Sequence, residues 1–450
     1  MRLKKIRVDG LFDRFTHEIP LKLKEHITII HGPNGFGKTM ILRMINAFFN
    51  QSPIALAAIS FRKLRLDFDN GAFVSVHRKK PGKTRERNAR AHIEMSYTER
   101  GKTSPPFTPK SGIHPEQLGF PISAIEDFIP ELDRADRQIW RHRGTGEMLP
   151  LEEVLDRYRD ILPLGEPDRD PAIPEWLQAI RQAIPVRFIN TERLYTVPSR
   201  RRRPGPYPSY IPPEPAVRRY SEELGEQIKQ TLTAYGALSQ SLDRTFPARL
   251  VTEPAQPDVT MDDLRTELAD IEARRQQLIE AGLLSPEPAG WGVPTMPPLE
   301  KVDKARLGVL AVYVRDAQKK LSVFDDVFTK IDLFKKIVNA RFLHKSITVG
   351  ASGFGFETSS GSQLEPVLLS SGEQHELVIL YELLFRVREN SIILIDEPEI
   401  SLHVVWQHEF LKDLGQIAAL SQFHALVATH SPQIISDRWD LTVELKGPVE

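Results

Sequence analysis

One glycine-rich stretch constrains the fold of this 450-residue chain more than any other feature: HGPNGFGKT at positions 31–39. It fits the pattern G-x-x-x-x-G-K-[ST], in which backbone N–H groups close around phosphate oxygens. The β-branched run at 27–30 predicts a buried strand before it, and the apolar spacing over 40–49 predicts a helix after it. This strand–loop–helix order is the one that the motif requires, and the helix N-terminus adds the positive end of its dipole. We therefore predict a nucleoside triphosphate site at Gly32, Pro33, Asn34, Gly35, Phe36, Gly37, Lys38 and Thr39.

Two adjacent carboxylates, Asp396 and Glu397, follow an apolar run at 392–395 near the other end of the chain. Such a run predicts a buried parallel strand that delivers the acids to the carboxyl edge of a sheet. There Asp396 and the Thr39 hydroxyl would hold Mg²⁺, and Lys38 would reach the β- and γ-phosphates. Glu397 would orient and deprotonate an attacking water. The sequence thus predicts one reaction centre built from two remote segments.

A further apolar strand pattern at 425–428 ends at Thr429-His430. A lone histidine is more often structural. The position of this histidine at the end of a buried strand, however, favours a functional role beside a γ-phosphate. We predict His430 as a second catalytic residue.

A serine-rich segment, Leu369-Ser370-Ser371-Gly372-Glu373-Gln374, precedes an apolar helical pattern. Ser371 and Gln374 stand at the spacing of a capping box. An exposed Ser-Ser-Gly at a helix N-terminus is also a ready anion site. The residues alone leave both interpretations open.

Composition excludes several classes of protein. The formal net charge is +0, so the whole chain is no generic polyanion binder. The absence of cysteine excludes disulfides, thiolate zinc sites and a thiol nucleophile. We see neither a signal-peptide pattern nor a long apolar run, and we expect a cytoplasmic protein without a membrane partner.

The pattern of elements predicts an interrupted domain. Strands are expected at 3–8, 27–30, 64–68, 73–77, 91–97, 186–189, 347–349 and 354–356, and short helices at 123–129 and 151–161. Amphipathic stripes over 220–242 and 264–278 predict an antiparallel helical hairpin with breakers at 247–257, followed by one long helix through 307–328. We predict an N-terminal lobe at 1–100, an inserted region at 101–340 and a C-terminal lobe at 341–450.

Two basic stretches lie outside these motifs. The first runs over 78–90, and the second, over 198–213, places arginines beside prolines and two tyrosines. Each would suit nucleic acid, and the second would also suit an acidic partner protein. For the first stretch a solvated loop is the favoured interpretation, and for the second a charged loop is equally compatible with the pattern. The candidate contact residues are Arg200, Arg201, Arg202 and Arg203.

In order, these motifs resemble Walker A (32–39), signature (369–374), Walker B (392–397), D-loop (401–403) and switch histidine (430) of ABC-type ATPases, in the SMC, RecF and OLD-like branch of the AAA family. Ser371 stands where glycine is usual in the signature, and no Q-loop glutamine can be placed. The resemblance implies an α/β head, a mixed sheet flanked by helices, split by a large helical, short coiled-coil insertion. It also implies ATP and Mg²⁺ as ligands, and hydrolysis to ADP and phosphate.

Among relatives of this kind, the chain is similar to the stand-alone ATPases of anti-phage systems, such as AriA of PARIS, PtuA of Septu and retron-associated ATPases. We expect no TOPRIM or other nuclease site in this chain. The resemblance implies a homodimer or higher homo-oligomer whose two heads sandwich ATP, with Ser370, Ser371, Gly372 and Glu373 acting in trans. It further implies a separate effector, a nuclease or toxin. The alternatives are a DNA-repair ATPase of RecF or RecN type that binds DNA directly, and an ATP-dependent scaffold.

Overall fold

The computed structural model describes residues 1–50, 56–57, 59–79, 92–109, 121–129, 131–136, 138–143, 146–151, 154–155, 158, 162, 173–189, 195–196, 214–252, 260–286, 304–400 and 402–447. Its residues form two compact units, Met1–Ala216 with Val378–Glu450, and Val217–Leu377. The predicted division into lobes at 1–100 and 341–450 around an insertion stays a prediction. The predicted α/β class is confirmed, and the helical insertion is present.

The first unit contains an antiparallel sheet in the order β2-β1-β4-β5-β6-β7. Its strands are β1 (Leu3–Leu11), β2 (Phe15–Pro20), β4 (Lys63–Phe68), β5 (Phe73–Lys79), β6 (His92–Glu99) and β7 (Lys102–Thr103). The predicted turn between β4 and β5 is present, with the Asn70 side chain accepting from the Ala72 amide at 3.0 Å. Burial alternates along β4, because successive side chains of a strand point to opposite faces and the apolar ones face the core. The predicted strands in this part of the chain are confirmed.

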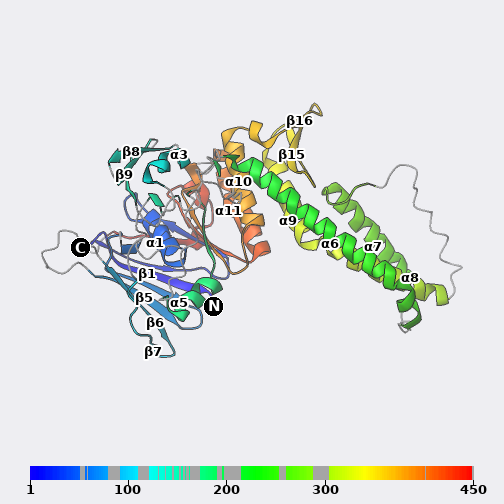
Figure 1. Ribbon diagram of the computed structural model, residues 1–450, viewed down its shortest axis with the longest axis horizontal. Helices are drawn as coiled ribbons and strands as arrows, with labels where there is room; N and C mark the ends of the chain where they lie inside the picture. The colour runs from blue at the N-terminus through cyan, green and yellow to red at the C-terminus, as the bar shows by residue number, and fades with distance from the viewer. Residues whose placement is uncertain are drawn as a thin grey trace. The chain divides into compact units, whose positions relative to one another are not determined.

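A parallel sheet in the same unit has the order β11-β17-β18-β3-β19 (Figure 1). Its strands are β11 (Val186–Ile189), β17 (Ile392–Asp396), β18 (His424–Ala428), β3 (Ile27–His31) and β19 (Thr442–Glu444). Every residue of β18 is buried, as expected for a central strand covered on both faces. Helix α1 (Lys38–Asn50) contacts β11, β17 and β18 through its apolar side. Because the strands are parallel, the carboxyl ends of β17, β18 and β3 lie at one edge.

Smaller elements complete this unit. The helices are η2 (Ile122–Ala124), α3 (Ile125–Phe128), α5 (Glu175–Ala183), η5 (Pro398–Ile400), α11 (Val404–Ser421), α12 (Pro432–Ile435) and η6 (Trp439–Leu441), and the short strands are β8 (Leu132–Asp136), β9 (Ile139–His142), β10 (Met148–Pro150), β12 (Tyr195–Thr196) and β13 (Glu214–Pro215). Strands β8 to β10 form a separate sheet around the fully buried Trp140. The helix predicted at 123–129 is found as η2 and α3, whereas most of the one predicted at 151–161 lies outside the described residues.

The second unit is built on long helices and a small antiparallel sheet. Its elements are α6 (Ala216–Thr252), α7 (Met261–Glu280), α8 (Lys304–Ser322), α9 (Asp325–Arg341), β14 (Lys345–Gly350), β15 (Gly353–Thr358), β16 (Gln363–Leu364) and η4 (Pro366–Leu368), and α10 (Ser371–Phe385) continues into the first unit. Tyr235 packs against Phe324, and Asp243 pairs with Lys320 farther along α6. Because the residue numbers run in opposite directions, α6 and α8 are antiparallel (Figure 1). The helix predicted to follow the hairpin thus returns along α6, and α7 contacts it as well.

Two helix boundaries differ from the sequence prediction. The break predicted to begin at Pro247 is wrong, because α6 continues through this proline to Thr252. Beside this proline, the Arg249 guanidinium donates to the Leu242 carbonyl at 2.7 Å and to both carboxylate oxygens of Asp316. The single helix predicted over 307–328 is also wrong, because it is interrupted between α8 and α9. The Ser322 hydroxyl bonds back to the Lys319 carbonyl at 2.9 Å, and the acidic first turn of α9 starts a new helix.

None of the helices in the described part of the chain combines the length and the hydropathy that crossing a membrane requires.

Candidate active site

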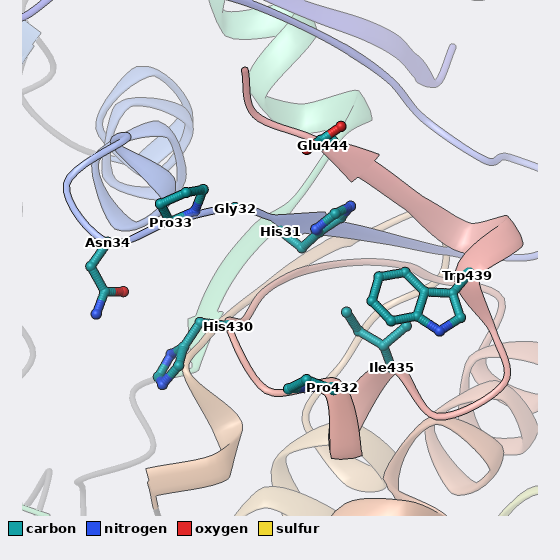
Figure 2. Close-up of a pocket in the computed structure, with 9 residues that line it drawn as sticks. All are labelled: His31, Gly32, Pro33, Asn34, His430, Pro432, Ile435, Trp439 and Glu444. Atoms are coloured by element: carbon teal, nitrogen blue, oxygen red, sulfur yellow. The ribbon is translucent and has the colours of Figure 1, made fainter. Parts of the chain in front are cut away.

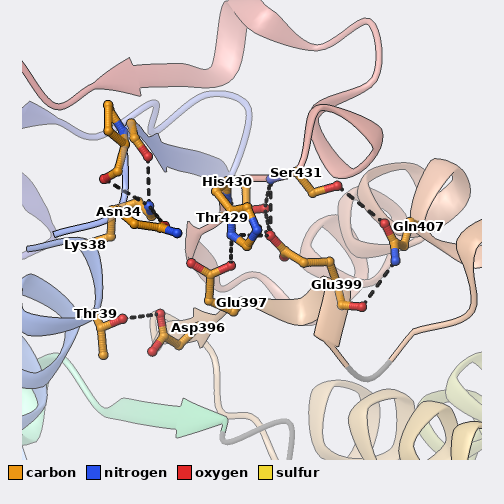
Figure 3. Close-up of polar contacts among 12 residues, drawn as sticks. Asn34, Lys38, Thr39, Asp396, Glu397, Glu399, Gln407, Thr429, His430 and Ser431 are labelled. Atoms are coloured by element: carbon orange, nitrogen blue, oxygen red, sulfur yellow. Dashed lines mark hydrogen bonds and ion pairs between the residues drawn. The ribbon is translucent and has the colours of Figure 1, made fainter. Parts of the chain in front are cut away.

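The glycine loop lies between β3 and α1, as predicted, and wraps around the side chain of Lys38 (Figure 3). Lys38 is 5% exposed, and its ammonium donates to the Gly32 carbonyl at 2.8 Å, the Pro33 carbonyl at 3.4 Å and the Asn34 side chain at 3.5 Å. Gly37 has a φ of +91°, and a Cβ there would lie 2.4 Å from a methyl carbon of Leu11. Only glycine fits this position. The loop therefore keeps a backbone cradle with a cation at its centre, which suits a polyphosphate.

His17 supports the loop from β2, and the sequence analysis missed it because it belongs to no motif. This histidine is 3% exposed, and its Nε2 donates to the Phe36 carbonyl at 3.0 Å. Burial lowers the pKa of His17, which favours the neutral ring. The peptide bond between Phe36 and Gly37 is trans, so the Gly37 N–H points away from His17. His17 thereby fixes the direction of one amide donor of the loop.

Thr39 and Asp396 meet although they are 357 positions apart in the sequence. The Thr39 hydroxyl donates to Asp396 Oδ1 at 3.0 Å. Burial raises the pKa of Asp396, and the hydrogen bond from Thr39 opposes that shift. A hydroxyl and a carboxylate held together at the end of a strand are hard oxygen ligands of the kind that Mg²⁺ prefers. The residues present therefore fit a magnesium ion.

Glu397 and His430 also lie together, at the ends of β17 and β18. The His430 Nδ1 lies 2.5 Å from Glu397 Oε2, and the Glu397 amide donates to the Ala428 carbonyl at 2.8 Å. Burial raises the pKa of Glu397 to about 7, the nearby Glu399 adds to this, and His430 opposes it. Glu397 has a φ of +45°, a strained conformation for a residue with a side chain. Strain of this kind concentrates at functional sites.

A third carboxylate, Glu399, joins the same cluster and was also missed from the sequence. Single ligand atoms of Glu397, Glu399 and His430 lie within 4.8 Å of one another, an arrangement that could hold a metal ion. Hydrogen bonds account for it equally well, because Glu399 Oε1 already accepts from the Thr429 hydroxyl at 2.6 Å. The spacing of acids in Asp396-Glu397-Pro398-Glu399 was the available sequence signal.

A cavity of about 450 Å³ lies beside His430 and the start of the glycine loop (Figure 2). The carbonyl-rich start of the glycine loop and the His430 ring both line it, and the indole of Trp439 stands edge-on to His31 with ring centroids 5.5 Å apart. The lining residues are His31, Gly32, Pro33, Asn34, His430, Pro432, Ile435, Trp439 and Glu444. Open space thus reaches the loop and His430 together.

The predicted signature residues lie in the second unit, whereas Lys38 and Asp396 lie in the first. Helix α10 is capped by Ser370 and Glu373, one position earlier than the predicted pair Ser371 and Gln374. Gln374 instead donates to the Val367 and Leu369 carbonyls. Lys345 holds Glu373 at 2.7 Å. A role for Ser370, Ser371, Gly372 and Glu373 in trans stays a prediction.

Other predicted features lie outside the described residues. These are Arg200, Arg201, Arg202 and Arg203, most of the basic stretch over 78–90, and Ser401 of the D-loop motif. The strand β11 ends at Ile189 beside β17, and the residues directly after it are also outside.

Comparison with known proteins gives a partial family match. Residues 266–436 match the family model described as "AAA domain, putative AbiEii toxin, Type IV TA system". This segment of the chain is similar to an AAA domain. The match includes the signature segment, β17 and His430, and it does not extend to the glycine loop.

Individual proteins match either over a short segment or at low sequence identity. Protein ea59 of Escherichia phage lambda is 30% identical over 125 residues, which are 27% of this chain and 24% of ea59. The chain thus matches about a quarter of the length of that relative. An Smc head domain from Pyrococcus furiosus, with an extended coiled coil and bound to the C-terminal domain of ScpA, is 12% identical with a TM-score of 0.35, covering 99% of this chain and 94% of that one. The SMC head domain from Thermotoga maritima is 12% identical with a TM-score of 0.30 and full coverage of both chains.

Proposed function

We propose that this protein is an ABC-type ATPase that hydrolyses ATP to ADP and phosphate at the site of Lys38, Thr39, Asp396 and Glu397. One observation carries the proposal: the Thr39 hydroxyl lies 3.0 Å from Asp396, so the glycine loop and the paired acids form one centre. Glu397, the carboxylate with a raised pKa, directly follows Asp396 in the chain.

The residues present have distinct tasks in this reaction. The loop amides and Lys38 would bind and orient the phosphates. Thr39 and Asp396 would hold Mg²⁺, which when bound neutralises charge on the phosphate oxygens. Glu397 would accept a proton from water as the water oxygen bonds to the γ-phosphorus and the bond to the β-phosphate oxygen breaks. His430, bonded to Glu397 at 2.5 Å, would keep that carboxylate oriented.

We further propose that two heads close on ATP, with the signature segment of one protomer facing the glycine loop of the other. Exposed apolar side chains on each unit support such contacts. In the first unit, Ile400 and Val404, which flank the D-loop motif, are 67% and 53% exposed, and in the second unit Leu368, just before the signature segment, is 68% exposed. The closed state would last until hydrolysis.

We propose a role in bacterial anti-phage defence as a sensor that regulates a separate effector. The support is the match to a family model whose description names a putative AbiEii toxin. The helical arm of α6, α7 and α8 offers a surface for such an effector, a nuclease or toxin encoded separately.

The variant Glu397→Gln tests the reaction. It should bind ATP with wild-type affinity and lose turnover by about 100-fold or more, because it lacks the base but keeps the size of the side chain. The ATP-bound variant should accumulate as a dimer in size-exclusion chromatography with light scattering. Glu389→Gln, an exposed carboxylate before β17, is the matched control. Unchanged turnover in Glu397→Gln would show that another group is the base.

A further inference from the structure

Two loops carry the candidate catalytic pair, and Glu399 joins them. Glu397 and Glu399 belong to the loop after β17, and His430 belongs to the loop after β18. Glu399 Oε1 accepts from the Thr429 hydroxyl at 2.6 Å and from the backbone amides of His430 and Ser431, each at 3.1 Å (Figure 3). One carboxylate oxygen thus holds three consecutive residues of the other loop.

Burial increases the free-energy cost of losing these hydrogen bonds. The Glu399 side chain is 8% exposed, and Thr429 is fully buried. A buried donor that loses its acceptor costs more free energy than the net gain of making an ordinary hydrogen bond. Removing the Glu399 acceptor would therefore release the loop or leave its donors unpaired.

Gln407 of α11 ties the same two loops a second time. Its amide nitrogen donates to the backbone carbonyl of Glu399 at 3.2 Å, and its amide oxygen accepts from the Ser431 hydroxyl at 3.4 Å. This bond to the Glu399 backbone is independent of the carboxylate, so the loop after β17 stays anchored when the side chain is changed. A substitution at Glu399 should consequently loosen the His430 loop selectively.

We propose that Glu399 is a positioning residue: its carboxylate straps the Thr429–Ser431 segment so that the His430 ring stays against Glu397. This inference rests on the proposed ATP hydrolysis. It assigns Glu399 no contact with nucleotide, and it attributes the effect to the position of His430, whose Nδ1 also lies 3.3 Å from Glu399 Oε1. Loss of the strap should thus slow turnover while leaving nucleotide binding intact.

The alternative is that Glu399 acts through its charge, and the choice of variants separates the two. Glu399→Gln keeps an acceptor oxygen for the three donors and removes the charge. Its new NH₂ group takes the place of Oε2, which has no hydrogen-bond partner in the structure. Glu399→Ala removes strap and charge together. Thr429→Val keeps the side-chain shape and removes the hydroxyl, which donates to Glu399 and accepts from the Ser431 amide at 3.0 Å. This variant covers the case in which Glu399→Ala fails to fold.

The experiment measures kcat and KM for ATP, and amide hydrogen exchange of residues 429–431 in the nucleotide-free protein. We expect Glu399→Gln to retain at least half of the wild-type kcat and its amide protection. We expect Glu399→Ala to lose kcat by about tenfold or more, with KM within twofold and faster exchange at His430 and Ser431. Thr429→Val should fall between them, and Glu389→Ala should match wild type.

Two outcomes would overturn the inference. One is wild-type kcat in both Glu399→Ala and Thr429→Val; the other is equal loss of kcat in Glu399→Gln and Glu399→Ala, which would assign the effect to charge. The exchange measurement needs no turnover, so it reports on the strap even if the chain hydrolyses no ATP. An inactive wild-type protein would contradict the proposed function instead.

Discussion

At the residue scale, the site depends on side chains whose contacts are distant in sequence. Lys38, Thr39, Asp396 and Glu397 could be predicted because their motifs have fixed local spacing and fixed chemistry. His17 and Glu399 could not, because only the folded sheets bring them to their partners. No spacing in the sequence reports which histidine meets which carbonyl.

His17 should influence nucleotide affinity without touching nucleotide. His17→Leu removes the bond to the Phe36 carbonyl and should weaken binding of a fluorescent ATP analogue by about fivefold, the equivalent of one hydrogen bond. His17→Gln keeps an N–H donor and should recover much of that loss. His92→Leu, an exposed histidine on β6, serves as control. Equal affinity in wild type and His17→Leu would contradict the role given to His17.

His424 should make the protein sensitive to acid. Burial lowers the pKa of His424 to about 4, with help from nearby His26 and Arg2, and its Nε2 pairs with the Thr28 hydroxyl at 3.0 Å. The unfolded chain therefore takes up the proton first as pH falls. Stability should be complete above pH ~6.5 and decline by about 3 kcal/mol down to pH ~4.

Urea unfolding midpoints between pH 7.5 and 4 measure this loss. His424→Gln cannot titrate and keeps a polar contact for Thr28, so its midpoint should change less over the same range. Parallel pH profiles for the two proteins would show that His424 is not the titrating group.

At the scale of elements, helix boundaries followed tertiary contacts where they departed from the sequence pattern. Pro247 would normally end a helix, yet α6 continues through it, and Arg249, after the proline, donates to the Leu242 carbonyl before it and to Asp316 of α8. Four strands of the parallel sheet, β3, β11, β17 and β18, were predictable because each is a short, mainly apolar run, whereas the short strand β19 (Thr442–Glu444) was not predicted. The order β11-β17-β18-β3-β19 was not, since it joins segments from both ends of the chain.

The ion pair of Arg249 with Asp316 should stabilise the helical arm. These side chains are 18% and 7% exposed, whereas Asp243, paired with Lys320 on the same two helices, is 70% exposed. Asp316→Ala removes the counter-ion of this largely buried guanidinium and should cost about 3 kcal/mol. Asp243→Ala should cost under about 1 kcal/mol. Unfolding monitored by limited proteolysis within α6 compares the two, and equal effects would mean that burial of the first pair is unimportant.

At the scale of the whole molecule, two segments that are remote in the sequence lie together and form one candidate nucleotide site. The matched AAA-family model covers 266–436 and so includes only one of the two segments. The glycine loop follows β3 and the paired acids stand at the end of β17. These two strands flank β18 in the parallel sheet.

ATP titration with and without Mg²⁺ tests this claim most directly, in wild type, Lys38→Ala and Asp396→Asn. Lys38→Ala should lose binding under both conditions. Asp396→Asn should match wild type without Mg²⁺ and lose the added affinity that Mg²⁺ gives to wild type. Identical Mg²⁺-dependent binding in Asp396→Asn and wild type would contradict the account, because the two segments would then not share one nucleotide.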